Sequence, residues 1–118
     1  MVNINSETDN ITDFFKFLGN LERKNSQLFK ILSNKIGLLS VKVQLSKIAA
    51  DNKIHAKILE DLGQKIGNSE IKTKYCKKQL SVVGRTTKMI LKQVIQKENI
   101  TIEELSDYLV IMNACVAR

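Results

Sequence analysis

The stretch Val41–Ile66, VKVQLSKIAADNKIHAKILEDLGQKI, decides the fold because it predicts one long amphipathic helix. Its apolar residues recur at alternating steps of three and four positions, which is the spacing of one helical face. The predicted buried face consists of Val41, Leu45, Ile48, Asn52, His55, Leu59, Leu62 and Ile66. Asn52 and His55 are polar, and a buried polar group needs a hydrogen-bonding partner. The sequence therefore predicts that another helix supplies partners for Asn52 and for His55, the only histidine of the chain.

Three further helices are predicted around this one, and no sheet. The absence of proline and the presence of only five glycines favour long uninterrupted helices. Asn10 is a good N-cap, and the sequence Thr101-Ile-Glu-Glu104 is a capping box. We expect helices near residues 11–36, 40–66, 69–98 and 102–117, with Ser69 capping the third. The expected fold is an all-α, antiparallel four-helix bundle, in which residues 1–10 form a flexible leader and residues 11–118 one domain.

The first two helices are expected to form a hairpin, because the connection around Gly37 is short. The apolar stripe of the first helix consists of Phe14, Leu18, Leu21, Asn25, Leu28 and Leu32. In an antiparallel hairpin with this connection, Glu22 lies level with His55, and Asn25 lies level with Asn52. The sequence thus predicts that four polar side chains meet in one layer between these helices.

Two segments of this hairpin, LERKNSQLF (21–29) and IAADNKIHAKILEDL (48–62), resemble the first two helices of the ferritin-like superfamily, rubrerythrin type. The resemblance implies half of a di-iron site, made of one Glu and a Glu-x-x-His motif. Glu22 matches the first Glu and His55 the histidine, but Asn52 stands where the motif has Glu. The predicted third helix has no carboxylate on its buried stripe, and the fourth has no histidine. The resemblance therefore implies a degenerate, incomplete di-iron site.

Two interpretations of Glu22 and His55 follow. One is a polar contact that remains after ancestral ligands were lost, which we favour because two protein ligands hold a metal poorly. The function expected with it is a non-catalytic ferritin-like binding or scaffolding module without a cofactor. The alternative is a rubrerythrin-like metal-dependent oxidoreductase or iron-binding protein, holding iron or another divalent metal, in which a symmetric copy supplies the missing ligands.

The positive charge of the chain lies in one segment. Residues 71–97 contain eight of the 19 Lys and Arg residues and none of the 12 Asp and Glu residues. Helical spacing places five of these basic residues on one face of the third helix: Lys74, Lys78, Arg85, Lys88 and Lys92. Such a face is either an ordinary solvated surface or a site of weak, non-specific binding to nucleic acid or another polyanion.

The remaining features bound the class of protein. No signal peptide or apolar run long enough to span a membrane is visible, and Cys76 and Cys115 suggest no disulfide framework, so a cytoplasmic protein is expected. The single histidine has no nucleophile near it in sequence, which favours a protein that is not an enzyme. Because the fourth helix is short, one end of the bundle is uncovered, and a homo-oligomer, most simply a dimer, is expected.

Overall fold

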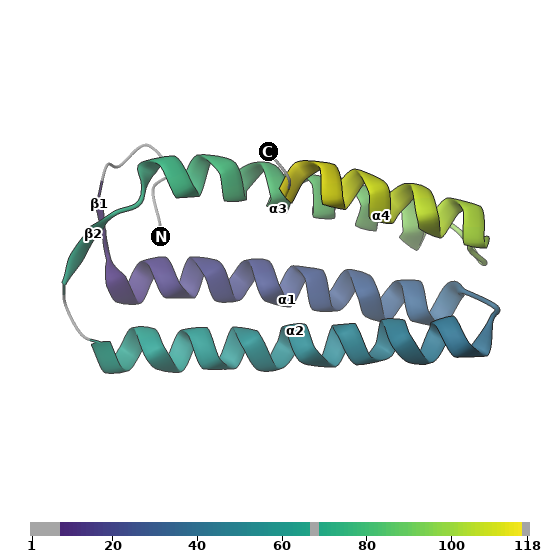
Figure 1. Ribbon diagram of the computed structural model, residues 1–118, viewed down its shortest axis with the longest axis horizontal. Coiled ribbons are helices and arrows are strands. Elements are labelled where there is room, and N and C mark those ends of the chain that lie inside the picture. Colours follow the sequence, from purple (N-terminus) through teal and green to yellow (C-terminus); the bar gives the residue numbers. More distant parts are fainter. Residues whose placement is uncertain (1–7, 67–68, 117–118) are drawn as a thin grey trace.

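A computed structural model describes residues 8–66 and 69–116. This part of the chain is largely helical and contains one small sheet (Figure 1). The elements follow one another in the order β1 (Thr8–Asn10), α1 (Ile11–Lys35), α2 (Leu39–Ile66), β2 (Glu70–Lys72), α3 (Lys74–Ile95) and α4 (Ile102–Val116). Four helices make up most of the described chain, which fits the predicted all-α class.

The directions of the helices follow from two pairings at opposite ends of the molecule. At one end, β1 and β2 pair antiparallel with Asp9 opposite Ile71, so α1 and α3 both begin there. At the other end, Ile36 forms a bridge with Ile100, and the Ile100 N–H donates to the Lys35 carbonyl over 2.9 Å. Because α1 and α3 start and finish at the same ends, they run parallel. Helices α2 and α4 return in the opposite direction, as Figure 1 shows.

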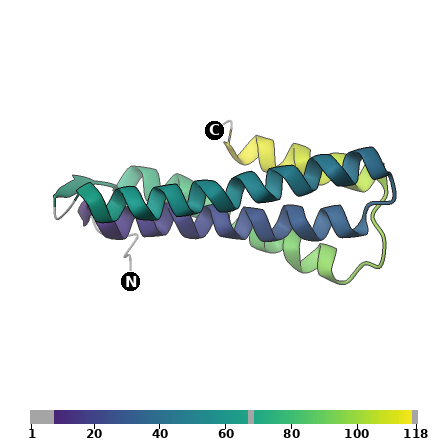
Figure 2. The same ribbon diagram turned by 90° about the horizontal axis from the view of Figure 1, so that it is seen from below.

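Helix α1 is central. Helix α2 packs mainly against α1, and α3 and α4 lie on the other side of α1 (Figure 1). Seen from below, α3 crosses behind α1, and near the α1–α2 connection α3 and α4 lie on opposite sides of α1 (Figure 2). The apolar core is formed at the end of the molecule nearest the α1–α2 connection: Leu28, Leu32, Ile36, Leu45, Ile90, Val94, Ile100, Leu105 and Tyr108 are all buried. Helix α2 therefore packs along one side against α1, and much of its remaining surface is exposed.

Small residues bring α1 and α2 close together. The two helices meet in three successive rungs of small residues, seven residues apart along each helix: Thr12 with Gly63, Gly19 with Ala56, and Ser26 with Ala49. One further step along, the Lys42 Nζ donates to the Ser33 carbonyl at 2.7 Å. At Gly19 an added Cβ would lie 3.3 Å from the Ala56 carbonyl oxygen, and at Gly63 it would lie 2.7 Å from the Cβ of Phe15. Larger side chains at these positions would push the helices apart.

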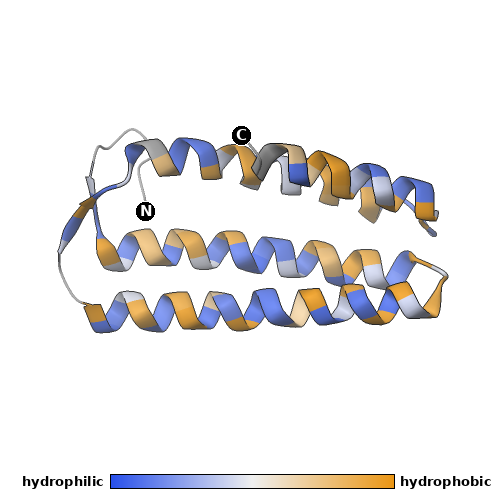
Figure 3. Ribbon diagram, in the orientation of Figure 1, coloured by the Kyte–Doolittle hydropathy of each residue, from blue (hydrophilic) through white to orange (hydrophobic). Residues whose placement is uncertain are grey.

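This packing corrects the predicted buried face of α2. The buried residues of α2 are Leu45, Ala49, Ala56 and Gly63. Ile48, Leu62 and Ile66, which were predicted to be buried, are 40%, 43% and 49% exposed. The prediction followed the large apolar residues, whereas the helix turns its small residues toward α1 because these allow the closest backbone approach. These three large apolar residues are consequently left exposed. Figure 3 shows hydrophobic residues, in orange, recurring along the whole of α2.

The predicted helix ends are partly confirmed. The Asn10 side chain accepts from the Thr12 N–H at 2.8 Å, and the Thr101–Glu104 capping box forms with both reciprocal bonds at 3.1 Å. The prediction that no sheet exists was wrong. The predicted start of the third helix, with Ser69 as its cap, was also wrong, because residues 70–72 are β2 and α3 begins at Lys74. Cys76, in the first turn of α3, is exposed.

The predicted flexible leader, residues 1–10, was wrong for its last three residues, while residues 1–7 lie outside the described part. Residues 8–10 form β1, and Asp9 is held by two bonds. Asp9 Oδ2 accepts from the Lys77 Nζ and from the Thr73 Oγ1, each at 2.6 Å. Lys77 is fully buried, so this contact joins β1 to the first turn of α3. The sequence did not reveal it because its partners are 68 residues apart.

Candidate functional site

Glu22 and His55 face each other across α1 and α2, as the hairpin predicts. The His55 Nδ1 lies 3.9 Å from the Glu22 Oε2. This distance allows an electrostatic contact but is too long for a hydrogen bond. Among the described residues, Glu22 Oε2 is a buried atom without a hydrogen-bond partner. The contact thus brings together a poorly solvated carboxylate and an imidazole that is accessible from outside.

The surroundings of this pair differ from the predicted buried layer. The His55 side chain is 58% exposed, whereas that of Glu22 is 29% exposed. Burial raises the pKa of the Glu22 carboxyl group above its ordinary value, and the nearby His55 opposes this shift only in part. His55 was predicted to be buried, but it is exposed because α2 turns the neighbouring Ala56 toward α1 instead. The polar layer is therefore a half-open pair at the surface of the hairpin.

Asn25 does not join this layer. Its side-chain oxygen accepts a hydrogen bond from Thr87 Oγ1 of α3 at 2.9 Å, and Thr87 is buried. The predicted meeting of Asn25 with Asn52 was therefore replaced by a bond that fixes α3 against α1. A buried polar pair of this kind aligns two helices, because any slip would leave both groups unsatisfied.

The donor set at Glu22 and His55 does not fit a di-iron centre. Asn52 lies one turn from His55 and offers an amide in place of the carboxylate of the Glu-x-x-His motif. In the part of the chain that the structure describes, no three His, Cys, Asp or Glu residues are grouped so that they could hold a metal ion. Glu22 and His55 are thus two donors, where protein metal sites usually provide three or four.

The basic face of α3 is exposed as predicted. Its five residues are all exposed: Lys74, Lys78, Arg85, Lys88 and Lys92. Lys77, which belongs to the same basic segment, instead points inward to Asp9. Burial raises the pKa of Asp9, but the hydrogen bonds from Lys77 and Thr73 outweigh this effect and hold that pKa below its ordinary value. The five exposed residues of α3 therefore present positive charge to solvent, whereas Lys77 stabilises the fold through its contact with Asp9.

An exposed apolar row on α2 was not predicted. We call it the α2 ridge: Ile54, Ile58, Leu62 and Ile66, which are 57%, 49%, 43% and 49% exposed. The four residues are spaced four positions apart, so they form one continuous row inclined to the helix axis. The signal was present in the sequence, but the helical period alone does not tell which of two apolar faces is turned inward.

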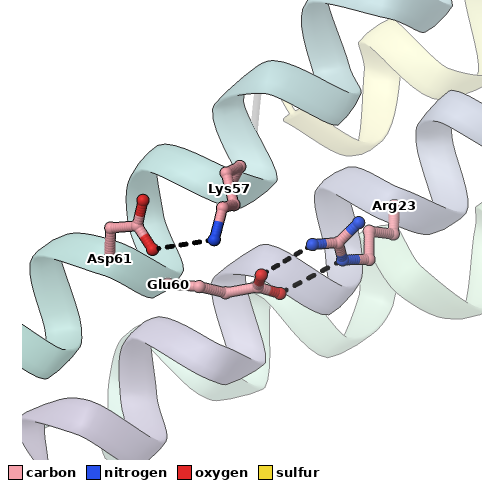
Figure 4. A network of polar contacts seen from close by, with 4 residues as sticks. All are labelled: Arg23, Lys57, Glu60 and Asp61. Carbon is pink, nitrogen blue, oxygen red and sulfur yellow. Dashed lines mark hydrogen bonds and ion pairs between the residues drawn. The ribbon is translucent and has the colours of Figure 1, made fainter.

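A second unpredicted feature is a basic groove between α1 and α2. Its rim includes Arg23, whose guanidinium donates to both carboxylate oxygens of Glu60, at 2.6 and 3.1 Å (Figure 4). This pairing holds the pKa of Glu60 below its ordinary value. Beside it, Lys57 pairs with Asp61 one turn along α2 at 3.1 Å. Sequence reasoning missed the groove because its basic residues, Arg23, Lys30 and Lys53, are separated in the chain and come from two helices.

Comparisons with known proteins do not assign a family. No family model matches the chain, and neither a curated protein nor a solved structure matches it. Within residues 8–66 and 69–116, none of the helices combines the length and the apolar character that crossing a bilayer requires. The function must therefore be inferred from the surfaces of the molecule itself.

Proposed function

We propose that this protein is a non-catalytic helical scaffolding module that associates with a second copy of itself through the α2 ridge. The observation that carries the proposal is the exposure of four large apolar residues in one row. Single exposed apolar residues are common on protein surfaces, but a contiguous row marks an interaction site. The row lies on a side of α2 that no other part of the described chain covers.

The ridge lies on a part of α2 that α4 does not reach. Helix α4 has 15 residues and α2 has 28, so α4 spans about 22 Å and α2 about 42 Å at 1.5 Å per residue. Figure 1 shows α4 ending partway along α1, on the half nearest the α1–α2 connection. The ridge lies on the other half of α2. An added helix at this place would bury apolar area that the chain itself cannot cover.

A second copy fits this surface because the ridge is self-complementary. Rows of residues four apart on two helices interdigitate when the helices cross at about −50°, the commonest packing class of globular proteins. Two α2 helices related by a two-fold axis satisfy this geometry with identical surfaces. The charged side chains beside the ridge, Lys57 and Asp61, already pair within α2, so they add no net repulsion at its edge.

The ferritin-like resemblance enters this proposal only for the first hairpin. The approach of Glu22 to His55 supports a relation for α1 and α2. Ferritin-like bundles contain one long crossover connection, whereas here residues 67–73 lead from α2 directly to an antiparallel α3. We therefore propose a rubrerythrin-like hairpin that is completed differently, and metal binding that depends on a second copy remains a prediction.

Solution mass measurements test self-association. The wild-type protein should be a dimer at micromolar concentration by light scattering coupled to gel filtration. Ile58→Glu should give a monomer with unchanged circular dichroism, because a charge at the centre of the ridge would be buried on association. The matched control, Val82→Glu, alters a similarly exposed residue of α3 and should stay dimeric. A wild-type monomer would refute the proposal.

The exposed basic face of α3 supports a second candidate function, weak binding to nucleic acid or another polyanion. Five exposed basic residues on one helix can contact several phosphates, because duplex DNA carries a charge about every 1.7 Å of its axis. Replacing Arg85, Lys88 and Lys92 together with Gln should weaken binding to a labelled duplex and flatten its salt dependence. Fluorescence anisotropy at low and physiological salt measures both. An unchanged triple variant would place the contact elsewhere.

A further inference from the structure

The basic groove between α1 and α2 has a volume of about 450 Å³. Its lining residues come from one face of each helix: Arg23, Ser26, Gln27, Lys30, Ser33 and Asn34 of α1, and Ser46, Ala49, Ala50 and Lys53 of α2. The groove is open because the residues at its bottom, Ser26 and Ala49, have small side chains. The same close approach that joins the helices at Ser26 and Ala49 leaves no large side chain to fill the surface above them.

The charge of this groove has one sign. Arg23, Lys30 and Lys53 are basic, and no acidic residue lines the groove. Glu60 lies beside it and engages Arg23. Among the described residues, no hydrogen bond or ion pair is found for the ammonium groups of Lys30 and Lys53. The groove therefore holds two available ammonium groups and one guanidinium that is partly neutralised.

The positions of these groups suit an elongated anion. The rungs place residues whose numbers add up to about 75 at the same level, so Lys53 lies near the level of Arg23. Lys30 is seven residues further along α1, about 10 Å at 1.5 Å per residue. Ser26 and Ser33 donate their hydroxyl protons to carbonyl groups, so Gln27, Asn34 and Ser46 are the neutral donors of the groove.

We propose that this groove binds a small polyphosphate, meaning two or three linked phosphate groups, either free or carried by a nucleotide. Phosphates at the two ends would meet Lys30 at one end and Lys53 with Arg23 at the other. Charge-assisted hydrogen bonds from these groups to phosphate oxygens are the strong contacts of such a site. The proposal is independent of self-association through the α2 ridge and of the basic face of α3.

Calorimetric titration with inorganic tripolyphosphate tests the site. Lys30→Gln and Lys53→Gln should each weaken binding about tenfold, since each removes one charge-assisted contact. The matched control is Lys24→Gln, which makes the same charge change on α1 outside the groove and should stay within about twofold of wild type. Equal losses in all three variants would mean non-specific attraction and would overturn the proposal.

Two further variants separate the groove from general charge effects. Ala50→Leu fills the groove without changing charge, so it should abolish binding of tripolyphosphate while helicity is retained. Glu60→Gln releases Arg23 from its carboxylate partner, so it should strengthen binding several-fold, a gain that loss of folding cannot mimic. Binding of adenosine triphosphate compared with tripolyphosphate distinguishes a nucleotide site from a site for the phosphate chain alone.

The same titrations test whether tripolyphosphate binds to the basic face of α3 instead of the groove. The triple change of Arg85, Lys88 and Lys92 to Gln on α3 should leave tripolyphosphate affinity within about twofold of wild type. Loss of tripolyphosphate binding in this variant, with Lys30→Gln and Lys53→Gln unaffected, would assign the anion to α3 and overturn the proposal. Absence of binding by the wild-type protein at low salt would overturn it as well.

Discussion

The hydroxyl group of Ser26 donates a 2.7 Å hydrogen bond to the carbonyl oxygen of Ala49, directly across the interface of α1 and α2. A side chain as short as serine reaches the backbone of a neighbouring helix only when the two helices are unusually close. A similar contact recurs two rungs along, where Thr12 Oγ1 donates to the Gly63 carbonyl at 2.8 Å. The hairpin is thus held by small residues and backbone contacts.

The first prediction concerns this close approach. Gly63→Ala should destabilise the protein by about 1–3 kcal/mol, because the added Cβ would lie 2.7 Å from the Cβ of Phe15 and force the helices apart. The steric effect should outweigh the roughly 1 kcal/mol by which alanine favours a helix over glycine. Gly37→Ala is the matched control, because no atom lies within 4 Å of its added Cβ. Urea denaturation measures both, and equal stabilities would contradict the packing argument.

The second prediction concerns the buried pair of Asp9 and Lys77. Asp9→Asn should lower the free energy of unfolding by about 3 kcal/mol, since it removes the charge that faces a fully buried ammonium group. Asp61→Asn removes the acid of an exposed pair with Lys57 and should change stability by less than about 1 kcal/mol. Thermal or urea unfolding at neutral pH distinguishes them.

The Asp9–Lys77 pair also predicts that the free energy of unfolding decreases at acidic pH. The folded-state pKa of Asp9 lies below its unfolded value. Its contribution is therefore fully present above the unfolded pKa and is lost as the pH falls through the folded pKa. Asp9→Asn should be less stable at neutral pH and should lose less stability on acidification than wild type. Parallel pH profiles of the two proteins would show that Asp9 is not the responsible group.

The third prediction concerns Glu22, whose shift has the opposite sign. Burial raises its folded-state pKa above the unfolded value, so the folded protein holds this proton more tightly. Stability should therefore fall as the pH rises from the ordinary carboxyl range through the raised pKa. Glu22→Gln should remove this fall and should be more stable at neutral pH, by no more than about 1 kcal/mol because the side chain is partly solvated. Glu98→Gln, at an exposed position, serves as the control.

The fourth prediction concerns metal affinity. Asn52→Glu places a carboxylate one turn from His55, on the side of α2 that faces Glu22, and thereby creates three donors. Affinity for a divalent ion such as cobalt should rise, and its visible absorption spectrum reports the coordination. The added His55→Ala change should reverse the gain. A variant that binds cobalt no better than wild type would show that these side chains cannot converge on one ion.

Much of the local structure was predictable from the sequence. The apolar period, the Asn10 cap and the Thr101–Glu104 capping box depend on residues within one or two turns, so they predicted the four helices and most of their ends. The short connection at Gly37 predicted the hairpin and the approach of Glu22 to His55. The exposed basic face of α3 followed from spacing alone.

Other features depend on partners that are distant in the chain. The predicted layer of Asn25 and Asn52 failed because Asn25 instead accepts a hydrogen bond from Thr87 of α3. The pairing of β1 with β2 and the burial of Lys77 require Asp9, which lies in a segment predicted to be flexible. No local pattern distinguishes a lysine that will be buried by such a contact from the exposed lysines around it.

The sequence by itself determined where helices form, because hydrogen bonding within a helix and its caps involve neighbouring residues. Only the tertiary structure decided which face of α2 is buried. Both an apolar row and a row of small residues follow the helical period, and the small residues Ala49, Ala56 and Gly63 allow the closer approach to α1. That choice leaves the α2 ridge at the surface and opens the basic groove, the two surfaces on which the proposed binding functions depend.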